Sequence, residues 1–123
     1  MGGVILLDTN ALIYWGQGRL PEPEEGSFLI TSVICELEVL TWPQMTPADE
    51  EVAREILKAV SVLPIDEPVK QQAIHIRRST GLSLPDSIIA ATASVTGAPL
   101  WTYDTALDRV EGLRVVAPPL LPV

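Results

Sequence analysis

Residues 4–15, VILLDTNALIYW, decide the fold class of this chain. The four apolar residues 4–7 predict a short buried strand, because glycines precede the run and polar residues follow it. A carboxylate, Asp8, comes directly after this strand, and the residues that follow predict a helix over 9–16. Asp8 can cap that helix, or it can form one corner of an anionic pocket, and this stretch alone leaves both interpretations open.

The rest of the chain repeats the alternation of an apolar strand with a helix. Further strands are predicted at residues 27–31, 61–65, 98–104 and 113–118, and further helices at 32–42, 46–60, 66–81 and 83–97. This order predicts one α/β domain over residues 1–123, with helices around a mainly parallel sheet. Such sheets bind ligands at the carboxyl ends of their strands, which is where Asp8 and Asp104 fall.

Composition narrows the class of protein. A hydrophobic content of 47% with 20% charged residues excludes a disordered chain. No run approaches the roughly 20 apolar residues that span a bilayer, and no basic segment precedes the first apolar run, so neither a membrane protein nor a signal peptide is expected. The single cysteine, Cys35, cannot form an internal disulfide. A cytoplasmic protein is therefore expected.

The formal net charge of −8 bears on possible partners. RNA would be repelled at long range, because its binding normally relies on Lys and Arg side chains that neutralise phosphates. The chain either avoids nucleic acid or concentrates its negative charge in a site that a divalent cation neutralises. Candidate cations for RNA contact are Arg19, Arg77, Arg78 and Arg109, although the Arg77–Arg78 pair can equally complement the end of a helix.

Three aspartates stand where local structure does not fully account for a charge. Asp8 and Asp104 each follow an apolar strand, and Asp86 lies in the first turn of an almost uncharged helix. Each has an ordinary explanation, since Asp8 and Asp104 can cap helices and Asp86 can complement a helix dipole. Their common feature is a position at the predicted ligand-binding edge of the sheet or on a helix that covers it.

A fourth acidic residue, Glu36, is less distinctive. It lies beside Leu37 and one turn before Leu40, at the edge of a predicted apolar stripe, and Glu38 is a similar neighbour. Glu36 can therefore be a solvated helix residue or a member of the same acidic set.

The acidic residues make chemical sense together if they surround a metal ion. Carboxylates brought close to one another repel, which raises their pKa values and lowers stability. Mg²⁺ or Mn²⁺ would relieve this repulsion, because both prefer oxygen ligands. One histidine and one cysteine cannot supply a zinc site.

Four blocks in this order, LLDTNALI, ITSVICEL, LPDSIIAATA and LWTYD, resemble the PIN-domain family and, more narrowly, its VapC-type ribonuclease toxins. The resemblance covers nearly the whole chain and implies a PIN-like three-layer α/β/α sandwich with a mainly parallel central sheet. It also implies RNA cleavage with Mg²⁺ (or Mn²⁺), homodimerisation, and inhibition by a cognate antitoxin whose tail enters the site. Carried over residue by residue, the resemblance implies that the catalytic and metal-binding residues are Asp8, Glu36, Asp86 and Asp104. It implies that two further residues orient them by hydrogen bonding, namely Asn10 and Thr102.

The chain departs from the family pattern at two places. Tyr103 stands where Asn is common, and Leu107 stands where an aromatic residue is usual a few residues after the last Asp. Asp108 beside it is either an additional acid of the site or a solvated residue. Two other functions stay open. One is a PIN-like module that binds a metal or a partner without cleaving RNA. The other is an aspartyl phosphotransferase with Asp8 as nucleophile, although its common form has a second Asp where this chain has Asn10.

Overall fold

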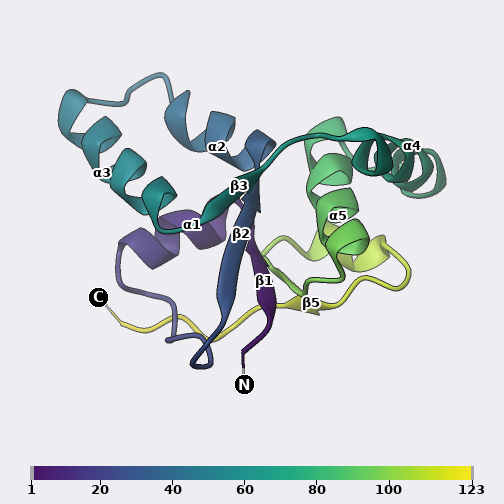
Figure 1. Ribbon diagram of the computed structural model, residues 1–123. Coiled ribbons are helices and arrows are strands. Elements are labelled where there is room, and N and C mark those ends of the chain that lie inside the picture. Colours follow the sequence, from purple (N-terminus) through teal and green to yellow (C-terminus); the bar gives the residue numbers. More distant parts are fainter. Residues whose placement is uncertain (1, 123) are drawn as a thin grey trace.

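The computed structural model describes residues 2–122 (Figure 1). Within that range a five-stranded sheet has the order β3-β2-β1-β4-β5, and every neighbouring pair of strands is parallel. The strands are β1 (Val4–Leu7), β2 (Phe28–Ser32), β3 (Ser61–Leu63), β4 (Leu100–Trp101) and β5 (Val115–Val116). The helices are α1 (Thr9–Gly16), α2 (Val33–Leu40), α3 (Pro47–Lys58), α4 (Glu67–Thr80), α5 (Leu84–Thr96) and the 3₁₀ helix η1 (Thr105–Arg109).

The helices cover both faces of the sheet. Figure 1 shows α1, α2 and α3 on one side of the strands and α4 and α5 on the other. This arrangement confirms the predicted α/β/α sandwich with a mainly parallel sheet. Among the described residues, no helix combines the length and the apolar character that crossing a membrane requires.

The central position of β1 follows from its composition. Leu6 and Leu7 are fully buried, because a parallel strand with helices over both faces has no polar side. On one side Ile5 is paired with Leu29 of β2, and on the other Leu6 is paired with Leu100 of β4. The carboxyl ends of these three strands consequently share one edge of the sheet, and Asp8 leaves the sheet at its middle.

Helices α4 and α5 begin and end at capping residues, which accounts for the agreement of their bounds with the predicted ones. The side chains of Asp66 and Ser83 accept hydrogen bonds from the backbone N–H groups of Val69 and Asp86 at the starts of α4 and α5. Gly81 ends α4 with a φ of 73°, a left-handed conformation that a side chain would strain.

The last two strands are shorter than predicted. β4 contains only Leu100 and Trp101, since Pro99 before it has no N–H to donate and Asp104 after it already caps η1. The polar residues Thr102 and Asp104 therefore lie just beyond the strand, at the same edge as Asp8.

Candidate carboxylate site

Asp8 combines the two roles that the sequence left open. Its side chain is buried, with 6% of the residue exposed, and Oδ1 accepts a hydrogen bond from the backbone N–H of Ala11 at 2.9 Å. Asp8 therefore caps α1. Burial raises the pKa of Asp8 above its ordinary value of 3.8, hydrogen bonds from Thr102 and Ala11 oppose that rise, and the charges of Asp104 and Asp86 add to it.

Asp104 and Asp86 lie near Asp8 from two other elements. Asp104 follows β4 and caps η1, with Oδ1 accepting from the Ala106 N–H at 2.9 Å. Asp86 lies in the first turn of α5. Partial burial raises the pKa of Asp86, as does the charge of Asp104. The structure thus brings the three predicted aspartates within electrostatic range of one another, from three different elements.

Glu38, and not Glu36, contacts this group. The Thr9 hydroxyl donates a hydrogen bond to Glu38 Oε1 at 2.6 Å, and the Glu38 charge contributes to the raised pKa of Asp86. Glu36 makes no side-chain hydrogen bond or ion pair within residues 2–122. Its role in the site stays a prediction from the sequence.

The geometry of α2 explains why the sequence could not distinguish the two glutamates. The buried stripe of α2 runs through Cys35 and Val39, whereas Leu37 is 51% exposed, so the predicted stripe beside Leu37 is wrong. At 3.6 residues per turn, Glu36 and Glu38 lie about 80° to either side of this stripe. The helix alone gives them equivalent positions, and only the packing of α1 and α5 on one side selects Glu38.

The two predicted hydrogen-bonding residues differ in their surroundings. Thr102 is buried between the carboxylates, where its oxygen accepts from the Asp104 N–H at 3.1 Å and its hydroxyl lowers the pKa of Asp8. Asn10 is exposed, and its side chain makes no hydrogen bond to a described residue, so its orienting role stays a prediction. Thr9, one residue earlier, makes the contact to Glu38. Asp108 is exposed on η1.

Tyr103 forms the border of the site between Thr102 and Asp104. Its hydroxyl donates to the carbonyl of Pro118 at 2.7 Å, and its ring meets Tyr14 edge to face, with 5.3 Å between the ring centres. Burial and the charge of Asp8 raise the pKa of the Tyr103 phenol. The C-terminal segment thus holds this aromatic residue beside the carboxylates.

The carboxylate oxygens of this site suit a hard cation, although the side chains do not by themselves surround one. Among the described residues, no three Asp, Glu, His or Cys side chains lie close enough together to form a ready-made metal cage. Mg²⁺ does not need one, since it usually keeps several waters and takes one or two carboxylates directly. Asp8 and Asp104 offer oxygen ligands, and their mutual repulsion would be relieved by a cation.

The raised pKa of Asp8 predicts how pH affects stability. A carboxyl group with a higher pKa in the folded state holds its proton more tightly when folded, so ionisation lowers the free energy of unfolding. We expect Asp8→Asn to become progressively more stable relative to the parent as pH rises from 3.8 through the raised pKa, and the difference to stay constant above it. Urea unfolding in chelator across this pH range measures the difference, and a difference independent of pH would contradict the prediction.

Comparison with known proteins places the chain among related folds. A family model described as PIN domain matches residues 5–113. No curated protein matches the chain at a significant level. A solved toxin–antitoxin complex from Klebsiella pneumoniae is 27% identical with a TM-score of 0.72, covering 93% of this chain and 97% of that one.

Two further solved structures are similar over nearly their whole length. FitAcB from Neisseria gonorrhoeae is 28% identical with a TM-score of 0.63, covering 93% of this chain and 97% of that one. VapBC2 from Rickettsia felis, bound to a DNA fragment from its promoter, has a TM-score of 0.77 over 92% of this chain and 97% of that one. At 14% identity the Rickettsia likeness shows the fold alone.

Proposed function

The chain belongs to the PIN-domain family, and from that membership we propose that it is a metal-dependent endoribonuclease, the VapC-type toxin of a toxin–antitoxin pair. The observation that carries the proposal is the electrostatic contact among Asp8, Asp86 and Asp104 at the carboxyl edge of the sheet. Burial and neighbouring carboxylates raise the pKa values of Asp8 and Asp86 at a ligand-binding edge of the sheet, and such raised pKa values are found more often at functional sites than elsewhere.

The residues of the site divide into those that hold the cation and those that orient them. Asp8 and Asp104 would hold Mg²⁺ (or Mn²⁺), with Asp86 binding directly or through water. When bound, the ion supplies a water of lowered pKa and neutralises charge on the phosphate. Thr102 keeps Asp8 oriented by its hydrogen bond, and the Ala11 N–H fixes the other side of that carboxylate.

Glu38 has the features of a proton acceptor. Its Oε1 is held by the Thr9 hydroxyl, and its exposed position leaves Oε2 free to accept a proton from an attacking water. Glu36 stays the alternative for this role, because the resemblance of the sequence to the family assigns the acidic position of α2 to Glu36. The two residues can be separated by experiment.

We propose RNA, a cognate antitoxin and a second copy of the chain as partners, in the cytoplasm. The antitoxin is supported by the similarity to the Klebsiella pneumoniae toxin–antitoxin complex. RNA would approach this acidic protein through local cations such as Arg78 and Arg109. Arg19 is already engaged, because its Nε donates to the Leu121 carbonyl at 3.2 Å and its guanidinium lies over the Tyr14 ring. Arg77 is less suited, because its Nη1 already donates to the Leu82 carbonyl at 2.8 Å, which favours the structural role for that member of the pair.

The direct test is RNA cleavage by the purified protein. We expect cleavage of a mixed set of structured and unstructured RNAs with Mg²⁺ or Mn²⁺, and none with excess chelator, because the carboxylates need a cation to hold the phosphate. Restoring the metal after chelation should restore cleavage. Binding of metal without cleavage of any RNA would favour a PIN-like binding module instead, and cleavage that persists in chelator would contradict the metal-dependent mechanism.

A further inference from the structure

Three side chains, Tyr14, Tyr103 and Arg19, form an aromatic cluster beside the carboxylate site. They come from α1, from the residues after β4 and from the loop that follows α1. The two tyrosine rings meet edge to face with 5.3 Å between their centres, and the guanidinium carbon of Arg19 lies 5.4 Å from the centre of the Tyr14 ring. None of the three side chains supplies a carboxylate oxygen, so the cluster serves a purpose other than holding the cation.

The C-terminal residues 118–121 hold this cluster in one arrangement. The Tyr103 hydroxyl donates to the Pro118 carbonyl at 2.7 Å. The backbone N–H of Leu121 donates to the Arg19 carbonyl at 2.7 Å, and the Nε of Arg19 donates back to the Leu121 carbonyl at 3.2 Å. Figure 1 shows this segment, in yellow, running from β5 toward the loop after α1. The Tyr103 ring is therefore already fixed, and a ligand that contacts it would not have to order it.

One face of the Tyr103 ring is left open by these contacts. An edge-to-face pair uses the edge of one ring and one face of the other, so Tyr14 covers at most one face of Tyr103. The hydrogen bond to the C-terminal segment is made by the hydroxyl, at the edge of the ring. Tyr103 is half-buried, so part of the residue stays in contact with water.

The ring lies close to where the proposed reaction would take place. Tyr103 stands between Thr102, whose hydroxyl bonds to Asp8, and Asp104. The charge of Asp8 acts on the Tyr103 phenol and contributes to its raised pKa. Only a sugar separates a base from its phosphate in RNA. A phosphate held at Asp8 and Asp104 would therefore bring a base within reach of the ring.

We propose that Tyr103 is a stacking platform for an unpaired base of RNA beside the bond to be cleaved. This inference rests on the proposed nuclease and names the form of its substrate, a single strand. Stacking suits an acidic site, because it needs no positive charge and every base has a face to stack. Bases inside a duplex are covered by their neighbours and cannot use such a platform. Asn, which is common at this position of the family pattern, has no ring, so the platform is a feature of this chain.

The test is a double-mutant cycle between the ring and single bases of the RNA. The probe is a labelled single-stranded RNA of about 12 nucleotides of mixed sequence, in which an abasic site is moved along one position at a time. Binding is measured by fluorescence anisotropy with Mg²⁺ in the Asp8→Asn background, where no cleavage is expected. Tyr103→Leu should weaken binding of the intact RNA about tenfold, and Tyr103→Phe, which keeps the ring, less than about threefold.

The abasic series identifies the base that stacks. At one position the abasic site should weaken binding about tenfold when Tyr103 is present and less than about twofold when Leu replaces it, because base and ring act as a pair. Phe28→Leu is the matched control, since Phe28 is 56% exposed at the first position of β2, at the opposite edge of the sheet. This control should alter binding less than about twofold. Circular dichroism checks that each variant keeps the fold.

The outcomes separate this platform from the nuclease itself. Absence of binding, equal binding with and without the Tyr103 ring, or abasic effects that are the same in both proteins would overturn the proposal. Equal weakening by Phe28→Leu would also overturn it. RNA cleavage without dependence of binding on the ring would keep the nuclease and remove the platform. Ring-dependent binding of RNA that the protein with Asp8 does not cleave would keep the platform and remove the nuclease.

Discussion

Asp8→Asn is expected to lower kcat/KM for RNA cleavage by a factor of about 10³ or more, since it removes a buried charge proposed to hold the catalytic cation. Asn keeps the size of the side chain, and its Oδ1 can still accept the N–H of Ala11, so the cap of α1 survives. The measurement is single-turnover cleavage of the best RNA substrate at saturating Mg²⁺, with metal binding followed in parallel.

Asp8→Ala is the matched control that separates the two roles of this residue. Alanine loses both the charge and the capping oxygen, and loss of a cap costs about 1 kcal/mol of stability. We expect both variants to be inactive, with Asp8→Asn at least as stable as the parent at neutral pH and Asp8→Ala less stable. If Asp8→Asn cleaved RNA at the parental rate, Asp8 would be a cap alone. If it melted much earlier than the parent, the charge would be structural.

Glu38→Gln is expected to lower the cleavage rate by about 10², whereas Glu36→Gln should change it less than about twofold. The reason is positional, because Glu38 accepts the Thr9 hydroxyl and acts on Asp86, and Glu36 contacts neither. Rates of both variants should be compared at saturating RNA and Mg²⁺, where a loss in kcat reports the chemical step rather than binding.

The pair is a balanced comparison, since both changes remove one negative charge from the same helix. Thr9→Val is a third variant for this comparison, because it removes the hydrogen bond to the Glu38 carboxylate but keeps the carboxylate itself. It should lower the cleavage rate less than Glu38→Gln does. Loss of cleavage in Glu36→Gln with retention in Glu38→Gln would support the assignment of Glu36 predicted from the sequence and remove Glu38 from the mechanism.

Much of the fold follows from local signals in the sequence. The apolar run that ends at Asp8 predicts the central strand, and Gly81 and Gly97 predict where two helices end. These signals act within a few residues of one another, so no knowledge of the tertiary structure is needed to interpret them. The alternation of strands and helices then predicts the parallel sheet.

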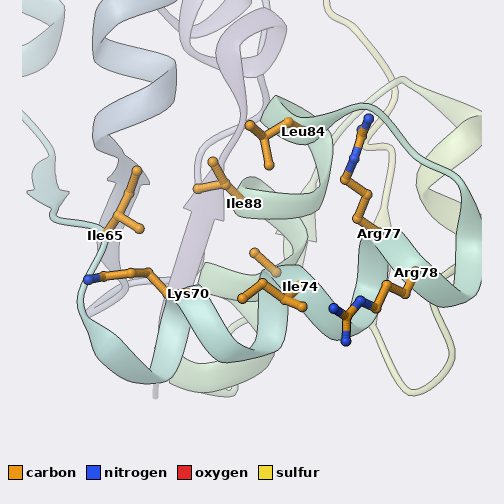
Figure 2. A pocket seen from close by; sticks show the side chains of 8 residues that line it. Ile65, Lys70, Ile74, Arg77, Arg78, Leu84 and Ile88 are labelled. Carbon is orange, nitrogen blue, oxygen red and sulfur yellow. The ribbon is translucent and has the colours of Figure 1, made fainter.

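The parts that could not be predicted depend on distant neighbours. Glu36 and Glu38 flank the buried stripe of α2 symmetrically, so the choice between them depends on Thr9 of α1 and Asp86 of α5. The sequence alone leaves Asp8 as either a helix cap or a member of an acidic site, yet in the structure it caps α1 and is also within electrostatic range of Asp104 and Asp86. The groove between α4 and α5 in Figure 2 likewise arises from the packing of two helices, because residues as far apart in the sequence as Lys70 and Ile88 line it together only in the folded chain.

The strand order also governs when the acidic edge can form during synthesis. The central strand, β1 (Val4–Leu7), leaves the ribosome well before β4 (Leu100–Trp101), one of its two neighbours. Until β4 has emerged, the N–H of Asp8 lacks the carbonyl of Trp101, and Asp104 is not yet in place opposite it. Domains fold as units, and pairing between distant segments is slow. Under the proposed function, a nascent chain therefore lacks a complete cation site until β4 and Asp104 have emerged, and an inhibitory partner meets active enzyme only after that point.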